Sequence, residues 1–227
     1  MHIEPGMVVG AKAILGSITA AGSLAVVGHL AVSSIKSPST LLAFGIRSVI
    51  ATLAVLFMFQ VLPHPPIGVS EVHLILGSTL FLLFGAGPAA AGLAGGLLLQ
   101  GLLFAPFDLP QYSMNVTTLI APLLAIHMLA KRLIASDTAY KDISYKQALA
   151  LSTTYQAGIV SWVAFWSFYG MGFTAESVMA VASFAAAYMS VILLEPLIDL
   201  AALGCAKTLA RHDRAGVIQQ RVFSAAN

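Results

Sequence analysis

The first two residues carry the most distinctive chemistry in the sequence. The chain opens Met1-His2-Ile3-Glu4-Pro5-Gly6, so a free α-amine on Met1 would stand beside the amide nitrogen and the imidazole of His2. Together these three nitrogens can close a five-membered and a six-membered ring on one metal ion. A deprotonated amide nitrogen favours flat coordination, which suits Ni(II) or Cu(II) and can hold Co(II) similarly. The alternative is that a histidine stands second in the chain by coincidence.

Other histidines and one asparagine could complete such a site. His73 is expected at the outer end of a membrane span, where it could supply a fourth nitrogen or simply face the interface. His64 stands among prolines and is expected to be a solvated loop residue. His29 and His127 are expected near inner helix ends, close to the headgroups. Asn115 and the threonines that follow it open a helix, where they either cap that helix or hydrogen-bond metal ligands.

Four carboxylates are the other informative side chains. Glu71 and Asp108 are expected in outer loops. Glu195 and Asp199 are four residues apart and therefore share one helix face near the inner end of the last span. They could contact a partner protein on the cytoplasmic side or pair with a basic side chain.

The composition identifies the kind of elements that must position these groups. Hydrophobic residues make up 59% of the 227 residues and charged residues 9%, whereas soluble domains have about 45–50% and about 25%. A soluble fold and a disordered chain are both excluded. The 11 Lys and Arg are too few and too scattered for a nucleic-acid surface, and the single Cys205 excludes a disulfide framework. We therefore expect an all-α polytopic membrane protein, in which buried polar groups are informative because lipid makes them costly.

About seven apolar segments are long enough, alone or as a hairpin, to be membrane spans. A hairpin at Gly85–Pro88 is expected to divide the long apolar stretch that begins at Val72, and small residues at Gly92 and Gly96 predict a close helix contact. The predicted spans are Val8–Ala31, Leu41–Leu62, Val72–Phe84, Pro88–Ala105, Asn115–Ala130, Gln147–Gly170 and Glu176–Leu203.

The basic residues predict the orientation. With seven spans, every Lys and Arg except Lys12 and Arg47 falls in loops or a tail on one side, which the positive-inside rule makes cytoplasmic. The N-terminus is then extracytoplasmic and the C-terminus cytoplasmic. We predict one membrane domain, with an N-terminal metal-binding arm (1–7), a helix bundle (8–203) and a cytoplasmic tail (204–227). The start lacks the features of a secretory signal, so Met1 is expected to remain in place.

Other function classes fit the sequence less well. It has no Gly-x-x-x-x-Gly-Lys-[Ser/Thr] loop for ATP, and no Gly-x-Ser-x-Gly or His-Glu-x-x-His motif of a hydrolase, so an enzyme is not expected. A haem-bearing membrane subunit stays open as an alternative, with His29 and His127 as the pair of axial ligands.

Three segments carry a family resemblance. The start Met1-His2-Ile3-x-x-Gly6, the run Gly68–Gly77 (GVSEVHLILG) and the pair Met114-Asn115 resemble the CbiM/NikM family. Its members are the substrate-binding membrane components of energy-coupling-factor (ECF) transporters for cobalt and nickel. The resemblance implies a square plane formed by the amine of Met1, the amide nitrogen and imidazole of His2, and the imidazole of His73, with Asn115 in support. His64 is the alternative fourth ligand, because the family's segment before the loop histidine is one residue shorter.

The resemblance also implies a role and partners. This chain would capture Co(II) or Ni(II) as cargo at the outer face of the cell (inner) membrane, and it would use no catalytic cofactor. A transmembrane coupling subunit and cytoplasmic ATPase subunits would supply the energy, with a small accessory membrane subunit as a further candidate. A rigid nitrogen plane disfavours tetrahedral Zn(II) and oxygen-bound Mg(II), whereas Cu(II) is the strongest competitor.

Overall fold

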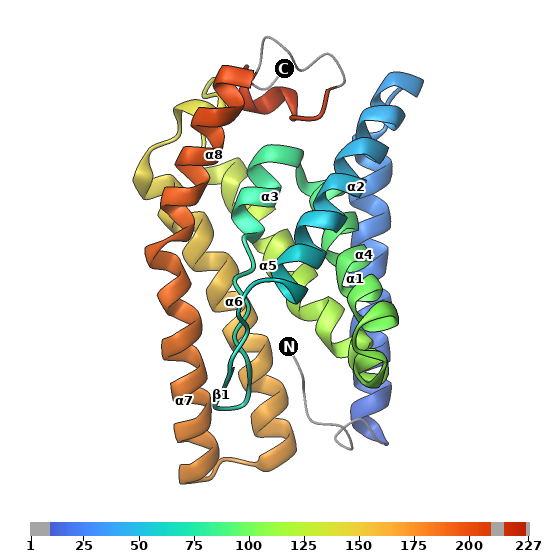
Figure 1. Cartoon of the computed structure of the whole chain (residues 1–227), viewed down its shortest axis with the longest axis vertical. Coiled ribbons are helices and arrows are strands. Elements are labelled where there is room, and N and C mark those ends of the chain that lie inside the picture. The colour runs from blue at the N-terminus through green and yellow to red at the C-terminus, as the bar shows by residue number, and fades with distance from the viewer. Residues whose placement is uncertain (1–9, 210–215, 226–227) are drawn as a thin grey trace.

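The chain folds into a bundle of helices that run up and down between two ends (Figure 1). The computed structural model describes residues 10–209 and 216–225, without the side chain at 209. The α-helices are α1 (Ala11–Ser34), α2 (Pro38–Gln60), α3 (Gly77–Phe84), α4 (Ala86–Leu103), α5 (Tyr112–Leu133), α6 (Tyr145–Met171), α7 (Ala175–Met189) and α8 (Glu195–Leu209). Short 3-10 helices occupy Pro106–Gln111, Tyr140–Asp142, Ser190–Leu193 and Gln220–Val222, and a small hairpin pairs β1 (Pro66–Ile67) with β2 (Ser70–Glu71).

The two ends of the bundle differ in composition. One end, here called the hairpin end, contains the β1–β2 hairpin, the 3-10 helix Pro106–Gln111 and the turn between α6 and α7 (Figure 1). The other, here called the tail end, contains the α1–α2 and α5–α6 connections and the described tail residues 216–225. The described basic residues that the sequence assigns to one side, Lys36, Lys141 and Arg221 among them, are on segments at the tail end.

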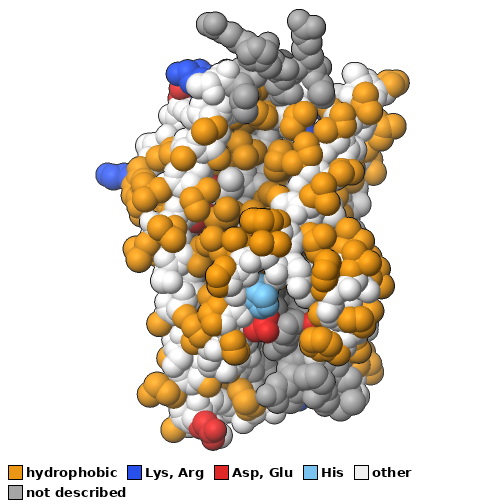
Figure 2. All heavy atoms as spheres, viewed as in Figure 1, with side chains coloured by type: hydrophobic (Ala, Val, Ile, Leu, Met, Phe, Trp, Pro, Cys, Tyr) orange, Lys and Arg blue, Asp and Glu red, His pale blue; other side chains and the backbone are white. Residues whose placement is uncertain are grey.

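The bundle presents an apolar surface along its length. Within the part of the chain that the structure describes, five helical stretches are long and apolar enough to cross a membrane. They are Ala11–Ser34, Pro38–Gln60, Ala86–Leu103, Pro106–Leu133 and Ala175–Thr208. Large apolar side chains such as Leu42 and Met179 are exposed on the outside of this bundle, and orange hydrophobic atoms dominate the face shown in Figure 2. The protein is therefore an all-α membrane protein.

The third predicted span is wrong in its first part. Residues 72–76 are not helical, and α3 begins only at Gly77 and has 8 residues. Gly68 has a φ of 65°, which glycine adopts without strain, and it turns the chain between β1 and β2. The chain then runs through the bundle without regular secondary structure, and His73 and Ile75 are buried there. Non-helical backbone is tolerated at membrane depth only where protein surrounds it, and apolar composition cannot distinguish that environment from lipid.

The last predicted span is divided. Instead of one helix over Glu176–Leu203, α7 ends at Met189, a 3-10 helix follows, and α8 begins at Glu195. Pro196 stands in the first turn of α8, where its missing N–H is harmless, but its ring would clash with the carbonyl one turn earlier in a continuous helix. The break brings the first turn of α8 against α3, the short helix that follows the extended segment.

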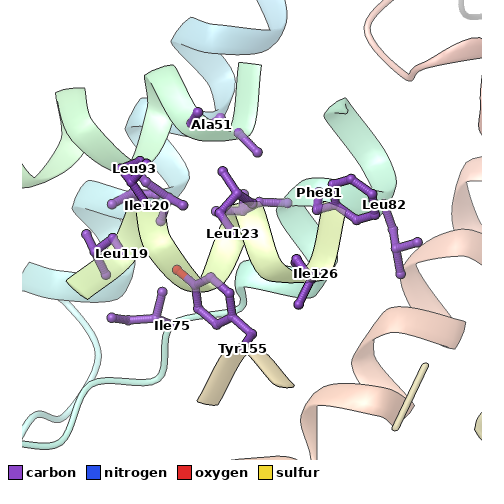
Figure 3. Packing of buried hydrophobic residues seen from close by; sticks show 14 of the residues in the cluster. Ala51, Ile75, Phe81, Leu82, Leu93, Leu119, Ile120, Leu123, Ile126 and Tyr155 are labelled. Atoms are coloured by element: carbon purple, nitrogen blue, oxygen red, sulfur yellow. The ribbon is translucent and has the colours of Figure 1, made fainter. Parts of the chain in front are cut away.

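The other helical predictions are confirmed to within a few residues, including the tight connection at Gly85 between α3 and α4. The small residues of α4 make the close contact that their spacing predicts. A Cβ added at Gly96 would lie 2.6 Å from Val55, and one at Gly92 would overlap Ala51, both on α2. The core is continuous around α5, whose Leu119, Leu123 and Ile126 converge with side chains from neighbouring elements (Figure 3).

Candidate metal-binding site

The β1–β2 hairpin places a carboxylate beside a buried imidazole. Glu71 ends β2, and His73 follows two residues later in extended backbone, so the two side chains leave the chain on the same face. His73 Nε2 and Glu71 Oε2 are 3.2 Å apart, and the imidazole is only 1% exposed. A neutral imidazole that donates Nε2–H to this carboxylate carries its lone pair on Nδ1. Such a carboxylate partner is the usual way in which a metal-binding histidine is oriented.

Two aromatic neighbours hold the His73 ring. Phe59 of α2 packs at 4.7 Å between ring centroids with the planes tilted by 57°. His64 stacks on the other side at 5.0 Å, with planes only 11° apart. His64 lies in a loop, as the sequence predicts, but it is half-buried and is a packing partner of His73. Because ring lone pairs lie in the ring planes, two parallel stacked imidazoles do not converge on one ion.

Buried polar side chains gather where α5 begins. Asp108 and Gln111 belong to the preceding 3-10 helix, and Asn115 lies in the first turns of α5. Asn115 shares a small pocket with Asp108 and with Gln100 of α4. Asp108 also interacts electrostatically with Glu71, which connects this cluster to the His73 contact. Asp108 is buried, and so is not the plain outer-loop group that the sequence suggests.

Asn115 does not cap its helix. α5 begins at Tyr112, so the run 115–118 lies inside the helix, and Thr118 bonds back to the carbonyl of Met114. Within residues 10–209 and 216–225, the side-chain oxygens of Asn115 and Gln111 accept no hydrogen bond. Leaving a buried acceptor unsatisfied costs about 1–3 kcal/mol. A hydrogen-bond donor that reached either oxygen would therefore be favourable.

The other predicted ligands are outside the described residues. Met1 and His2 precede Gly10, the first residue that the structure describes. Among the described side chains, no group of three or more His, Cys, Asp or Glu is arranged to hold a metal ion. What the described residues provide is one oriented, buried imidazole next to a polar cluster. Figure 2 shows a histidine and acidic side chains together on the surface of this part of the molecule, among mostly apolar side chains.

The two histidines of the haem alternative lie in different surroundings. His29 is exposed on α1. His127 is half-buried on α5, and its ring packs edge-on against Phe81 of α3 at 5.9 Å. Axial haem ligation would need both imidazoles directed at opposite faces of one flat ring.

Glu195 and Asp199 do not face a partner protein. Both are 0% exposed, and each accepts hydrogen bonds from side chains inside the bundle. The i, i+4 spacing correctly places them on one face of α8, but that face is turned inward. The sequence could not show this, because the break before Pro196 sets the direction of α8.

The sequence matches a known family of membrane proteins over most of its length. The model of the CbiM family, described as a cobalt uptake substrate-specific transmembrane region, matches residues 2–212. The chain belongs to the CbiM family. A CbiM protein is a component of membrane transport and not a catalytic enzyme, and the family description indicates cobalt as the transported ion. The apolar helix bundle agrees with this membrane role. No curated protein and no solved structure matches the chain.

Proposed function

We propose that this CbiM protein is the substrate-capture component of an ECF-type importer for Co(II) or Ni(II). It would bind the ion at the hairpin end, facing the outside of the cell membrane. The observation that carries the proposal is the buried His73 imidazole, held by Glu71 at the end of the bundle where α1 begins. The nine residues before Gly10 could extend over about 30 Å, so a ligand at position 2 has ample reach.

The proposed ligands are four nitrogens in one plane. They are the amine of Met1, the amide nitrogen and imidazole of His2, and Nδ1 of His73. The stacked, half-buried His64 supports the ring of His73 and is the weaker candidate for this ligand. Asn115 and Gln111 would accept hydrogen bonds from N–H groups of the N-terminal arm, which would satisfy their buried oxygens. Because amine, amide and imidazole must all lose protons, binding weakens as the pH falls.

The proposed topology has seven passes, with the hairpin end outside and the basic tail end in the cytoplasm. The third pass combines the non-helical residues 72–76 with α3, which at about 12 Å is too short to cross the roughly 30 Å of the hydrocarbon core alone. The seventh pass combines α7 and α8. A membrane coupling subunit and ATPase subunits would dock at the tail end and supply the energy for release inward.

Metal titration of the purified chain in detergent tests the ligand set. One variant adds two residues before Met1, which keeps every side chain but moves the terminal amine. Two residues are added because a single added residue would make His2 the third residue of the chain, and a histidine in third place forms another flat metal chelate. This variant, His2→Ala and His73→Ala should each lose more than about 100-fold in Ni(II) and Co(II) affinity, beyond the effect of an outer-shell partner.

His64→Ala is the matched control, because it removes the stacked ring but no proposed ligand. It should lose less than about tenfold. Native affinity in the extended variant would contradict the N-terminal chelate. Native affinity in His73→Ala, combined with a large loss in His64→Ala, would move the fourth ligand to His64.

A further inference from the structure

The backbone that joins His73 to α3 is held at two points by side chains from other helices. The carbonyl oxygen of Ile75 accepts a hydrogen bond from Gln156 Nε2 of α6 at 2.9 Å. The amide N–H of Ser78, in the first turn of α3, donates to Glu195 Oε1 of α8 at 3.2 Å. The connection from Ile75 to Ser78 is thus held at both ends by side chains of α6 and α8.

The two holding side chains also hold each other. Gln156 Nε2 donates to Glu195 Oε2 at 2.7 Å, and Ser152 Oγ donates to the same oxygen at 2.6 Å. Gln156, Ser152 and Glu195 are all 0% exposed. The three donors to Glu195 leave this carboxylate one orientation, so Gln156 is fixed relative to both α8 and Ile75. We call Gln156 and Glu195 the carboxylate clamp.

The clamp replaces a local helix cap. Leu76, the residue before α3, offers no side-chain cap, although the first turn of a helix has N–H groups without intrahelical partners. Glu195 supplies the acceptor from another helix, and its negative charge suits the positive end of the helix dipole. Asp199, one turn later in α8, has different partners. Among the described residues, it accepts hydrogen bonds from the hydroxyls of Ser78 and Thr79, at 2.7 and 2.5 Å, and from no backbone N–H.

His73 is coupled closely to the clamped segment. The N–H of Ile75 donates to the carbonyl of His73 at 3.0 Å, which closes a tight three-residue turn. The clamp therefore limits where the His73 ring can lie. A buried carboxylate is expensive, and apolar side chains of similar size would often give an equally stable fold. Stability alone is thus a weak reason for a glutamate at this place.

We propose that Gln156 and Glu195 are positioning residues for metal capture, which hold the His73 imidazole in the geometry that the ion needs. The inference rests on the proposed function, in which His73 is a ligand. The clamp touches no metal ion; it acts through the backbone between His73 and α3.

Glu195→Gln tests the clamp, with Asp199→Asn as the matched control. Both replace a fully buried carboxylate of α8 by its amide, but only Glu195 bonds to Gln156 and to the α3 backbone. Each variant is made in the native chain and with His73→Ala. The readouts are Ni(II) affinity, the thermal midpoint of the metal-free protein and the visible absorption of bound Ni(II).

Glu195→Gln should lower the affinity by about tenfold or more and change the Ni(II) spectrum, whereas Asp199→Asn changes the affinity by less than about threefold. With His73→Ala present, Glu195→Gln should cause no further loss, because the ligand that it positions is gone. If Glu195→Gln does not fold, Gln156→Met removes the donor to Ile75 in an unbranched side chain and should give the same loss of affinity.

Three outcomes would overturn the inference. The first is native Ni(II) affinity in Glu195→Gln or Gln156→Met. The second is an equal loss of affinity in Glu195→Gln and Asp199→Asn that follows the fall in their thermal midpoints, and the third is that Glu195→Gln loses as much affinity in the His73→Ala background as in the native chain. These outcomes differ from a failure of the proposed function. In that case His73→Ala itself binds Ni(II) like the native chain, and the clamp then has no ligand to position.

Discussion

Replacing Glu71 by glutamine removes one charge at the candidate site and little else. Glutamine keeps an oxygen that can accept from His73 Nε2, now 3.2 Å from the carboxylate. Across the ring and a metal–Nδ1 bond of about 2 Å, that carboxylate would lie about 7 Å from the ion. The ion and one deprotonated amide carry a net charge of +1. At an effective dielectric constant of about 20, the lost attraction is about 2.4 kcal/mol, which is roughly a 50-fold loss of affinity.

Isothermal titration of the detergent-solubilised protein with Ni(II), at one pH and one salt concentration, measures this loss. Glu176→Gln is the matched control, because Glu176 is an exposed glutamate at the same hairpin end of the bundle. It should bind Ni(II) within about twofold of the native chain, since exposed charges are screened. Affinity within about twofold of native in Glu71→Gln would refute the reasoning, because the charge of the carboxylate would then not attract the ion.

Two further predictions concern the packing that supports the site. Gly96→Ala places a methyl group 2.6 Å from Val55, so it should lower the free energy of unfolding by about 1–3 kcal/mol. The control Gly28→Ala meets no atom within 4 Å and should not lower it. Equal thermal midpoints of the two variants in detergent would contradict the close α2–α4 contact. Gln219→Ala removes two hydrogen bonds from the tail to carbonyls in the last turn of α3, so the local stability there should fall by about 1–3 kcal/mol. Amide hydrogen exchange at that end of α3 should therefore be faster. The control Gln220→Ala, whose side chain is exposed, should leave the exchange unchanged.

Several features of the fold follow from local sequence. The charge content and the apolar runs predict a membrane bundle, and the Gly85–Pro88 breaker predicts the turn between α3 and α4. The Gly92 and Gly96 spacing predicts a face that a neighbouring helix approaches closely. Each of these depends on residues near one another in the chain, and this is why a single sequence is enough to find them. The start of the chain and the His73 segment also suggest the CbiM family, which the family model confirms.

The sequence could not find the side chains that surround His73. Glu71 and His64 read as outer-loop residues, yet the hairpin folds them against the imidazole. One signal was present, because the alternation Glu71-x-His73 puts both side chains on one face of an extended strand. The stacking of His64 had no such signal, since it depends on how the chain turns after α2.

The sequence by itself determined that this is a membrane protein, the approximate limits of most of its helices and its family. It also determined which residue types are available for a nitrogen site. What only the tertiary structure decided is where the apolar chain leaves the helix. Residues 72–76 are mostly apolar, like a lipid-facing helix, but they form a non-helical segment inside the bundle. The reason is that apolar side chains are equally well placed in lipid and in protein, whereas backbone polar groups are not. The donor for Ile75 and the acceptor for Ser78 come from Gln156 and Glu195, about 80 and 120 residues away in the chain, and only the folded bundle brings them together.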